Sequence, residues 1–167
     1  MSRTFEFYLS ESSINDLVKK LEKYQKELQD SKKYILEALA DYAYSRVKEN
    51  IINTVGKGGY PSTDTLLNSI EKSPIMNDMI SVYTDLAYAK YVEFGTGIVG
   101  SNNPHPQAAE QGWSYDKQTG WRYIGSDGNS YYTEGLEPHQ FMYNAWIDLK
   151  NNYIDIARKV LKERGLI

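Results

Sequence analysis

The chain has 167 residues, a formal net charge of −3 and no cysteine. This length fits one domain with a sizeable core, and the missing thiols exclude disulfides, zinc–thiolate sites and cysteine nucleophiles. Acidic and basic residues are mixed along the chain, which disfavours nucleic acid or an anionic membrane as a ligand, and no apolar run approaches the length of a membrane span. We therefore expect a soluble single domain over 1–167, with no secretory segment.

Two helical patterns are predicted within 1–54. Apolar residues recur at the helical spacing over 14–28 and again over 34–51. A straight helix across both patterns would be about 60 Å long, which exceeds a compact domain of this size. We therefore expect a break near Asp30, or an arm that projects outward.

A glycine-rich loop, a short helix and a hairpin are predicted next. The loop over 56–61 lacks the Gly-Lys-Ser/Thr order of a phosphate-binding loop, so a plain connection between helices is expected. Apolar residues over 66–70 follow the helical spacing. Two β-prone runs then flank Asn77-Asp78, a pattern that is typical of a hairpin.

The most informative stretch is 88–97, which reads Tyr-Ala-Lys-Tyr-Val-Glu-Phe-Gly-Thr-Gly. A short helix is predicted to end at Gly95, where a left-handed cap is wanted. The apolar residues that share one face of this helix are Tyr88, Tyr91 and Val92. The residues held at the resulting rigid corner are Glu93, Phe94 and Thr96. This corner is predicted to serve contact and not chemistry.

Residues 98–135 are rich in glycine, aromatic and turn residues and predict an aromatic meander. Three short strands are expected, over 113–115, 121–124 and 131–133. Three strands of this size are not stable alone, so the meander should pack on the rest of the domain or on another subunit.

A long amphipathic helix is predicted over 138–164, with Pro138 at its start and Gly165 beyond its end. The order of elements predicts an α+β fold. In this fold, long N-terminal and C-terminal helices pack on a small antiparallel sheet, and the aromatic meander is an insertion.

No pattern in the sequence predicts catalysis, a cofactor or a metal. His105 and His139 each follow a proline but lack the further ligands that a metal needs, so hydrogen-bonded loop histidines are expected. No Gly-x-Ser-x-Gly motif is present. A solvated surface is the expected place for most carboxylates, although the sequence leaves open a catalytic pair. The open pairs join Glu93 with Asp116, Glu134 or Glu137.

A second class of function stays open as the alternative. The segments 112–115 and 120–123 each read Gly-Trp-x-Tyr and resemble cell-wall-binding repeats, in which Gly-Trp hairpins stack on choline or sugar rings. Such modules need several repeats to bury their own faces, whereas one imperfect unit is present here. The alternative is therefore a carbohydrate-binding or cell-wall-binding module.

Four segments in order resemble a family of tailed-bacteriophage neck proteins, known by the tenth gene product of a lambdoid phage and related to lambda's tail-completion protein Z. They are 65–70, 88–97, the Gly-Trp-x-Tyr meander and 138–145. The central segment is the most specific. Two positions depart from the family's pattern: Asp64-Thr65 stands where the first motif begins with Thr-Gly, and Gln140 replaces the second proline of the last motif.

The resemblance implies a small protein of helices packed on an antiparallel sheet, which assembles into a ring, expected to be a hexamer, at the head-to-tail junction of the virion. Its implied partners are further copies of itself, the head-closure or connector protein and the tail-terminator protein, and the tape-measure protein is a further candidate. DNA would pass through the lumen without specific binding. Such a structural protein is made in the cytoplasm of the bacterial host.

The resemblance also directs attention to a set of interface residues. The open alternative is that Tyr91 and Phe94 are core residues. Glu93 is expected to accept hydrogen bonds from a neighbouring subunit or from the Gly95-Thr96-Gly97 turn. The predicted interface residues are Tyr88, Tyr91, Glu93, Phe94, Thr96, Trp113, Trp121 and Phe141.

Overall fold

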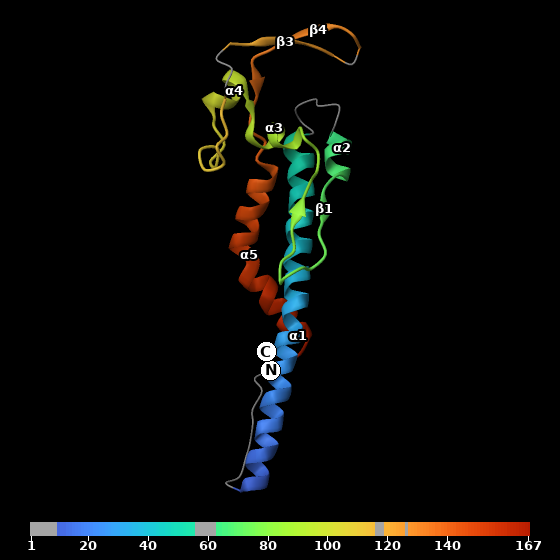
Figure 1. Ribbon diagram of the computed structural model, residues 1–167, viewed down its shortest axis with the longest axis vertical. Helices are drawn as coiled ribbons and strands as arrows, with labels where there is room; N and C mark the ends of the chain where they lie inside the picture. Colours follow the sequence, from blue (N-terminus) through green and yellow to red (C-terminus); the bar gives the residue numbers. More distant parts are fainter. Residues whose placement is uncertain (1–9, 56–62, 116–118, 126) are drawn as a thin grey trace. The chain divides into compact units, whose positions relative to one another are not determined.

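The computed structural model describes residues 10–55, 63–115, 119–125 and 127–167. Long helices near both ends of the chain and small two-stranded antiparallel sheets confirm the predicted α+β class (Figure 1). The chain divides into two compact units, each of which is built from segments that are distant in sequence. The first unit comprises Met1–Ala43, Lys72–Val82 and Asp148–Ile167, and the second comprises Tyr44–Glu71 and Tyr83–Ile147.

Helix α1 is continuous over Glu11–Asn50 and is followed by a π-helical turn, η1, over Ile51–Val55 (Figure 1). The predicted break near Asp30 is therefore wrong. Ser31 is fully buried, and its hydroxyl donates to the backbone oxygen of Glu27 over 2.7 Å while it accepts a hydrogen bond from Arg164 Nε over 3.0 Å. Because the polar side chain is satisfied inside the helix, it does not interrupt the helix.

The C-terminal part of α5 contacts α1 within the first unit. Helix α5 spans Phe141–Glu163 and ends before Gly165, as predicted, but it begins later than Pro138 because Gln140 has a positive φ of 51°. The Arg164 guanidinium lies 3.9 Å from the centroid of the Tyr34 ring. Beyond the helix, Leu166 is buried, and its backbone oxygen accepts a hydrogen bond from the Tyr24 hydroxyl over 3.3 Å.

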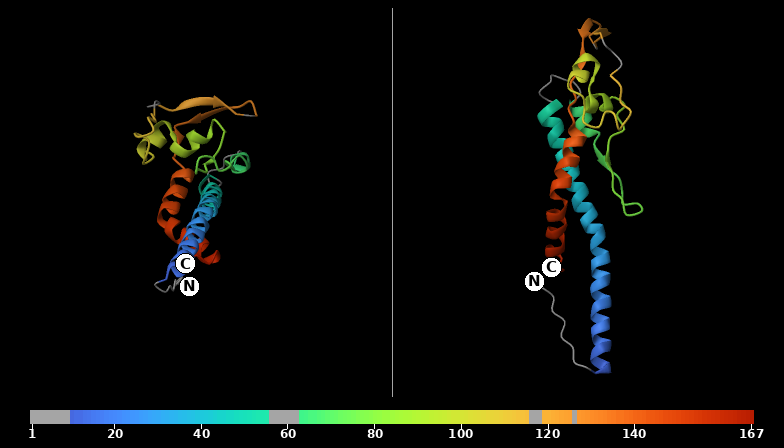
Figure 2. Two further views of the ribbon diagram at one scale, coloured as in Figure 1. Left: turned by 60° about the horizontal axis from the view of Figure 1, so that its bottom comes forward. Right: turned by 90° about the vertical axis from the view of Figure 1, so that its left-hand side faces the viewer.

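Strands β1 (Glu71–Lys72) and β2 (Val82–Tyr83) form the first two-stranded sheet and belong to the predicted hairpin. The hairpin is confirmed by an antiparallel bridge between Met76 and Met79. The two residues of its turn have φ of 50° and 61°, as a type I′ turn requires. Figure 2 shows this segment beside α1. Two ion pairs join them, Lys72 with Asp41 and Lys32 with Asp78.

The second unit has an apolar core drawn from the end of α1, η1, helix α2 (Thr63–Asn68), helix α3 (Ala89–Phe94) and the start of α5. The predicted short helix is present as α2, which ends before Ile70, while the glycine-rich loop over 56–61 lies outside the described residues. The buried residues of this core are Val47, Ile51, Val55, Leu66, Ile70, Ala89, Val92, Phe141 and Ala145.

The predicted meander differs from what the structure contains. Strands β3 (Trp121–Ile124) and β4 (Ser130–Thr133) pair antiparallel, and strand β5 covers Gly135–Leu136. The strand predicted over 113–115 is wrong, since this segment is irregular, and Gly97–Asn102 forms helix α4. Aromatic residues beside glycine are common to hairpins and to loops that pack their rings inward, so composition did not separate the two.

Candidate functional site

The corner that follows α3 depends on Gly95. Its φ is 76°, and its backbone N–H donates to the oxygen of Tyr91 over 2.9 Å, which ends the helix. A Cβ atom at this position would lie 2.6 Å from the backbone oxygen of Leu136 and 2.7 Å from the nitrogen of Pro138. Glycine is therefore required twice, by the positive φ and by the close approach of another segment. The predicted turn is confirmed, although ψ of 174° differs from that of a left-handed cap.

Gly97 allows the corner to pair closely with strand β5. Thr96 pairs with Leu136 and Gly97 pairs with Gly135 in antiparallel bridges. A Cβ atom on Gly97 would lie 2.5 Å from the backbone oxygen of Glu134. The chain thus passes too close to its partner segment for a side chain, and the backbone of the corner is held on both sides.

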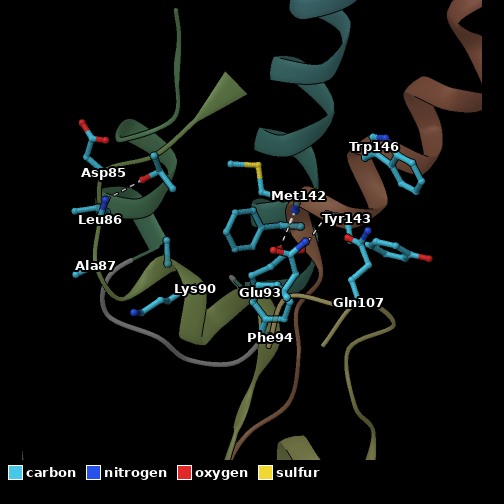
Figure 3. A pocket seen from close by; sticks show the side chains of 14 residues that line it. Asp85, Leu86, Ala87, Lys90, Glu93, Phe94, Gln107, Met142, Tyr143 and Trp146 are labelled. Carbon is cyan, nitrogen blue, oxygen red and sulfur yellow. Dashed lines mark hydrogen bonds between the residues drawn. The ribbon is translucent and has the colours of Figure 1, made fainter. Parts of the chain in front are cut away.

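The Glu93 carboxylate is buried beneath this corner and binds the first turn of α5 (Figure 3). Its Oε2 accepts the backbone N–H of Met142 and its Oε1 accepts that of Tyr143, each over 2.9 Å. A helix N-terminus presents unsatisfied N–H groups and partial positive charge, both of which a carboxylate satisfies. Glu93 therefore joins α3 to α5.

His105 completes the surroundings of this carboxylate. His105 is 3% exposed, its Nδ1 accepts the Gln107 N–H over 3.0 Å, and its Nε2 lies 3.2 Å from Glu93 Oε1. Because Nδ1 acts as an acceptor, we assign the proton to Nε2, which then donates to the carboxylate. The predicted hydrogen-bonded loop histidine is confirmed at this position.

This geometry corrects the hydrogen bonds that the sequence predicted for Glu93. The Gly95-Thr96-Gly97 turn is not among its donors in the structure. The donors are two backbone groups of α5 and one histidine, all within the same chain. Glu93 is 6% exposed, so its carboxylate supports the corner from beneath.

Aromatic rings pack around the corner from the loop that follows α4. Phe94 stacks on Trp113 with ring centroids 5.2 Å apart and an interplanar angle of 25°, and it lies 4.4 Å from the centroid of His105. The Trp113 indole N–H donates to the backbone oxygen of Gly95 over 3.2 Å. The Tyr115 hydroxyl donates to the backbone oxygen of Phe94 over 2.9 Å. These contacts pre-organise the corner.

Two hollows flank the corner in the second unit. The first has a volume of about 570 Å³, and Glu93, Phe94 and Phe141 are among its lining residues (Figure 3). The second has a volume of about 580 Å³ and lies on the aromatic side of the corner. Its lining residues are Tyr91, Thr96, Gly97, Gly112, Trp113, Ser114 and Trp121.

The predicted interface residues differ in exposure: some lie at the surface and others in the core. Tyr91 is 47% exposed and meets the edge of Trp113 at a centroid distance of 5.4 Å, so the alternative that it is a core residue is wrong. Phe141 is 1% exposed and belongs to the core. Phe94 is half-buried, and Tyr88 is half-buried at the N-terminus of α3.

Tyr115 is a site residue that the sequence reasoning missed. It was assigned to a strand, whereas its hydroxyl bridges two backbone groups by donating to Phe94 and accepting the N–H of His105. The available signal was the Gly-Trp-x-Tyr spacing, which places an indole N–H and a phenol hydroxyl after a turn. The spacing does not indicate which backbone groups these two polar groups bind.

The fold and the site define a small α+β protein whose principal site is a rigid corner held by helix capping and ring stacking. No cluster of three metal-ligating residues occurs among the residues that were placed, and no helix in the described ranges has the length and apolar character to cross a membrane. Residues 15–95 match the model of the family described as "Bacteriophage HK97-gp10, putative tail-component". The match confirms the predicted resemblance to a tailed-phage neck and tail family and supports a structural phage tail protein of the virion.

The matched range ends at Gly95 and so includes Tyr88, Tyr91, Glu93 and Phe94 of the predicted interface. It does not extend to the loop that carries His105 and Trp113. Comparisons with curated proteins and with solved structures found no match.

Proposed function

We propose that this protein is a neck or tail-completion component that forms a ring, expected to have six copies, between the head-closure and tail-terminator proteins of a tailed phage. Phage DNA passes through the lumen of this ring, and the tape-measure protein is a further candidate partner. The match to a tail-component family over 15–95, which ends at the rigid corner, is the observation that carries the proposal.

The corner has the properties expected of a subunit contact. In a head-to-tail ring each copy presents one patch to a different patch on its neighbour, and rigid aromatic side chains supply binding energy at low entropic cost. Tyr91 is half-exposed above Trp113, and both line the aromatic hollow with Trp121. We assign the contact to Tyr91, Trp113, Trp121 and Thr96. Glu93, Phe94 and Phe141 position these side chains, and Tyr88 lies at the start of the helix that carries Tyr91.

A pair of tyrosine variants tests this assignment. Tyr91 and Tyr153 are 47% and 50% exposed, so truncation of either removes a similar surface ring, but only Tyr91 lies at the corner. Tyr91→Ala should lower the amount of ring or partner complex at least tenfold, whereas Tyr153→Ala should leave it unchanged. The measurement is mass photometry of the purified protein with and without the head-closure protein, with thermal unfolding as the check on folding.

The proposal is overturned if the wild-type protein stays monomeric with every neck partner, or if phage lacking it still join heads to tails. Equal assembly by Tyr91→Ala and wild type would remove the corner from the interface but would leave the ring in place.

Carbohydrate binding remains the second candidate because one observation favours it. The tryptophans of both Gly-Trp segments, Trp113 and Trp121, line the same hollow, and no charged residue is among its lining residues. An uncharged hollow of aromatic rings and hydroxyls suits a neutral sugar ring. Tryptophan fluorescence titration with cell-wall oligosaccharides tests this: saturable binding that Trp121→Ala abolishes supports it, and no binding at millimolar sugar excludes it.

A further inference from the structure

Helix α1 carries an apolar stripe with the spacing of a coiled coil. Over 14–28 the apolar residues alternate at intervals of three and four positions, which is the seven-residue repeat of a left-handed coiled-coil seam. In that repeat, Ile14, Leu21 and Leu28 occupy one seam position, and Leu17 and Tyr24 occupy the other. Val18 widens the stripe on one side.

This part of the stripe is largely exposed. The relative exposures of Ile14, Val18, Leu21 and Leu28 lie between 39% and 47%, and no residue over 11–30 is buried. In proteins, most of the stability of a helix comes from packing of its apolar face. Residues that alternate so regularly and remain half-exposed are typical of a contact surface.

Farther along α1, the same stripe already contacts the C-terminal end of the chain. Tyr24 donates a hydrogen bond to the backbone oxygen of Leu166, and Ser31, which continues the Leu17 and Tyr24 position, is fully buried and bonded to Arg164. The exposed part is thus continuous with a contact that the stripe makes inside the first unit.

We propose that residues 14–28 of α1 pair with the same segment of a second copy of this chain, in parallel and in register. The parallel orientation rests on the charges that flank the seam, because equivalent positions of the two copies then face each other across a two-fold axis. Self-association itself needs neither the ring nor a phage partner.

Charge favours a second copy over a membrane as the occupant. Over 11–30 there are four lysines and five carboxylates, so the segment offers an anionic lipid surface no net positive charge. In a parallel, in-register pair, the flanking positions bring Glu27 of one copy to Lys32 of the other and oppose no like charges. Lys32 also pairs with Asp78, but its side chain remains 56% exposed, so a second carboxylate can reach it.

The absence of cysteine from the chain permits a direct test on the full-length protein. Leu21→Cys places one thiol in the seam, and the matched control Lys19→Cys places one on the exposed back of the same helical turn. Under mild oxidation at micromolar concentration, we expect Leu21→Cys to form a disulfide-linked dimer at least tenfold faster than Lys19→Cys. Equal rates for the two variants would overturn the proposal.

Orientation is tested with two more variants, Ile14→Cys and Leu28→Cys. In a parallel pair each cross-links with itself, whereas in an antiparallel pair cross-linking is efficient only when the two are mixed. Self-cross-linking of both supports the proposal, and cross-linking confined to the mixture overturns the orientation. A monomer that co-sediments with phosphatidylglycerol vesicles would overturn it in favour of a membrane.

These outcomes are separable from those of the proposed function. Self-cross-linking at Leu21→Cys in a protein that has no role in joining heads to tails would sustain the helix contact and sink the neck assignment. A ring in which Leu21→Cys and Lys19→Cys cross-link at equal rates would support the neck assignment and overturn the helix contact. Thermal unfolding of each reduced variant shows whether a slow rate reflects a lost fold, which is not expected at half-exposed positions.

Discussion

The Glu93 carboxylate accepts the backbone N–H of Tyr143 over 2.9 Å, across a separation of 50 residues in sequence. The same oxygen lies 3.2 Å from His105 Nε2, so one atom links α3, the first turn of α5 and the loop after α4. Because the aromatic rings of the corner are carried by these segments, the buried charge determines where the exposed rings point.

Replacement of this carboxylate should destabilise the fold. Glu93→Gln keeps the volume, but its amide offers one acceptor where the carboxylate offers two, and its NH₂ group faces N–H donors. The expected loss is about 1–3 kcal/mol of unfolding free energy. Chemical denaturation measures it, with the exposed Glu137→Gln as the control. A loss no larger than that of the control would contradict the capping role.

The corner should not tolerate a side chain at Gly95. Gly95→Ala combines a positive φ with a Cβ atom 2.6 Å from a backbone oxygen, whereas Gly112→Ala has a positive φ and nothing within 4 Å. The control therefore gives the cost of a positive φ without a close contact, about 1 kcal/mol. Gly95→Ala should cost about 2–5 kcal/mol in total, because its ψ of 174° also belongs to a region that only glycine adopts readily. Denaturant midpoints of the two variants give the difference. Equal costs would show that the segment opposite Gly95 moves away freely.

Acid should weaken the fold through His139. Burial lowers the pKa of this imidazole below its ordinary value of 6.5. A depressed pKa means that the unfolded chain binds the proton first, so the stabilisation is complete above pH 6.5 and is lost as the pH falls through the lower folded value. NMR titration of the ring should give a midpoint below 6.5. A midpoint at or above that value would show that the ring is solvated.

The hairpin tip provides a second pH test. Hydrogen bonds from Tyr131 and Asn129 lower the pKa of Asp127 to about 2 from 3.8. Tyr131→Phe removes the largest cause and should raise the pKa of Asp127 toward 3.8, whereas Tyr132→Phe should not change it. Carboxyl NMR titration measures both. The turn should stay ordered above about pH 4 and lose order as the pH falls toward 2, the direction expected for a carboxyl with a depressed pKa.

Local patterns determined the parts of the structure that neighbouring residues decide among themselves. Helical spacing indicated the helices of α1, α2 and α5, Asn77-Asp78 indicated the hairpin, and Gly95 indicated the end of α3, because each depends on the periodicity or dihedral preference of a few adjacent residues. The motif over 88–97 was the most specific of the four segments that indicated the phage family, and the match over 15–95 confirms the resemblance.

Only the tertiary structure decided what the polar and aromatic side chains of these elements do. Ser31 stays inside a continuous helix because Arg164, 133 residues away, binds its hydroxyl. Glu93 is a buried cap and not a surface charge because α5 presents two N–H groups to it, and Trp113 packs beneath the corner instead of extending a sheet. A carboxylate or an indole has the same local signature in water and in a core, so its role follows from partners that the sequence order does not place beside it.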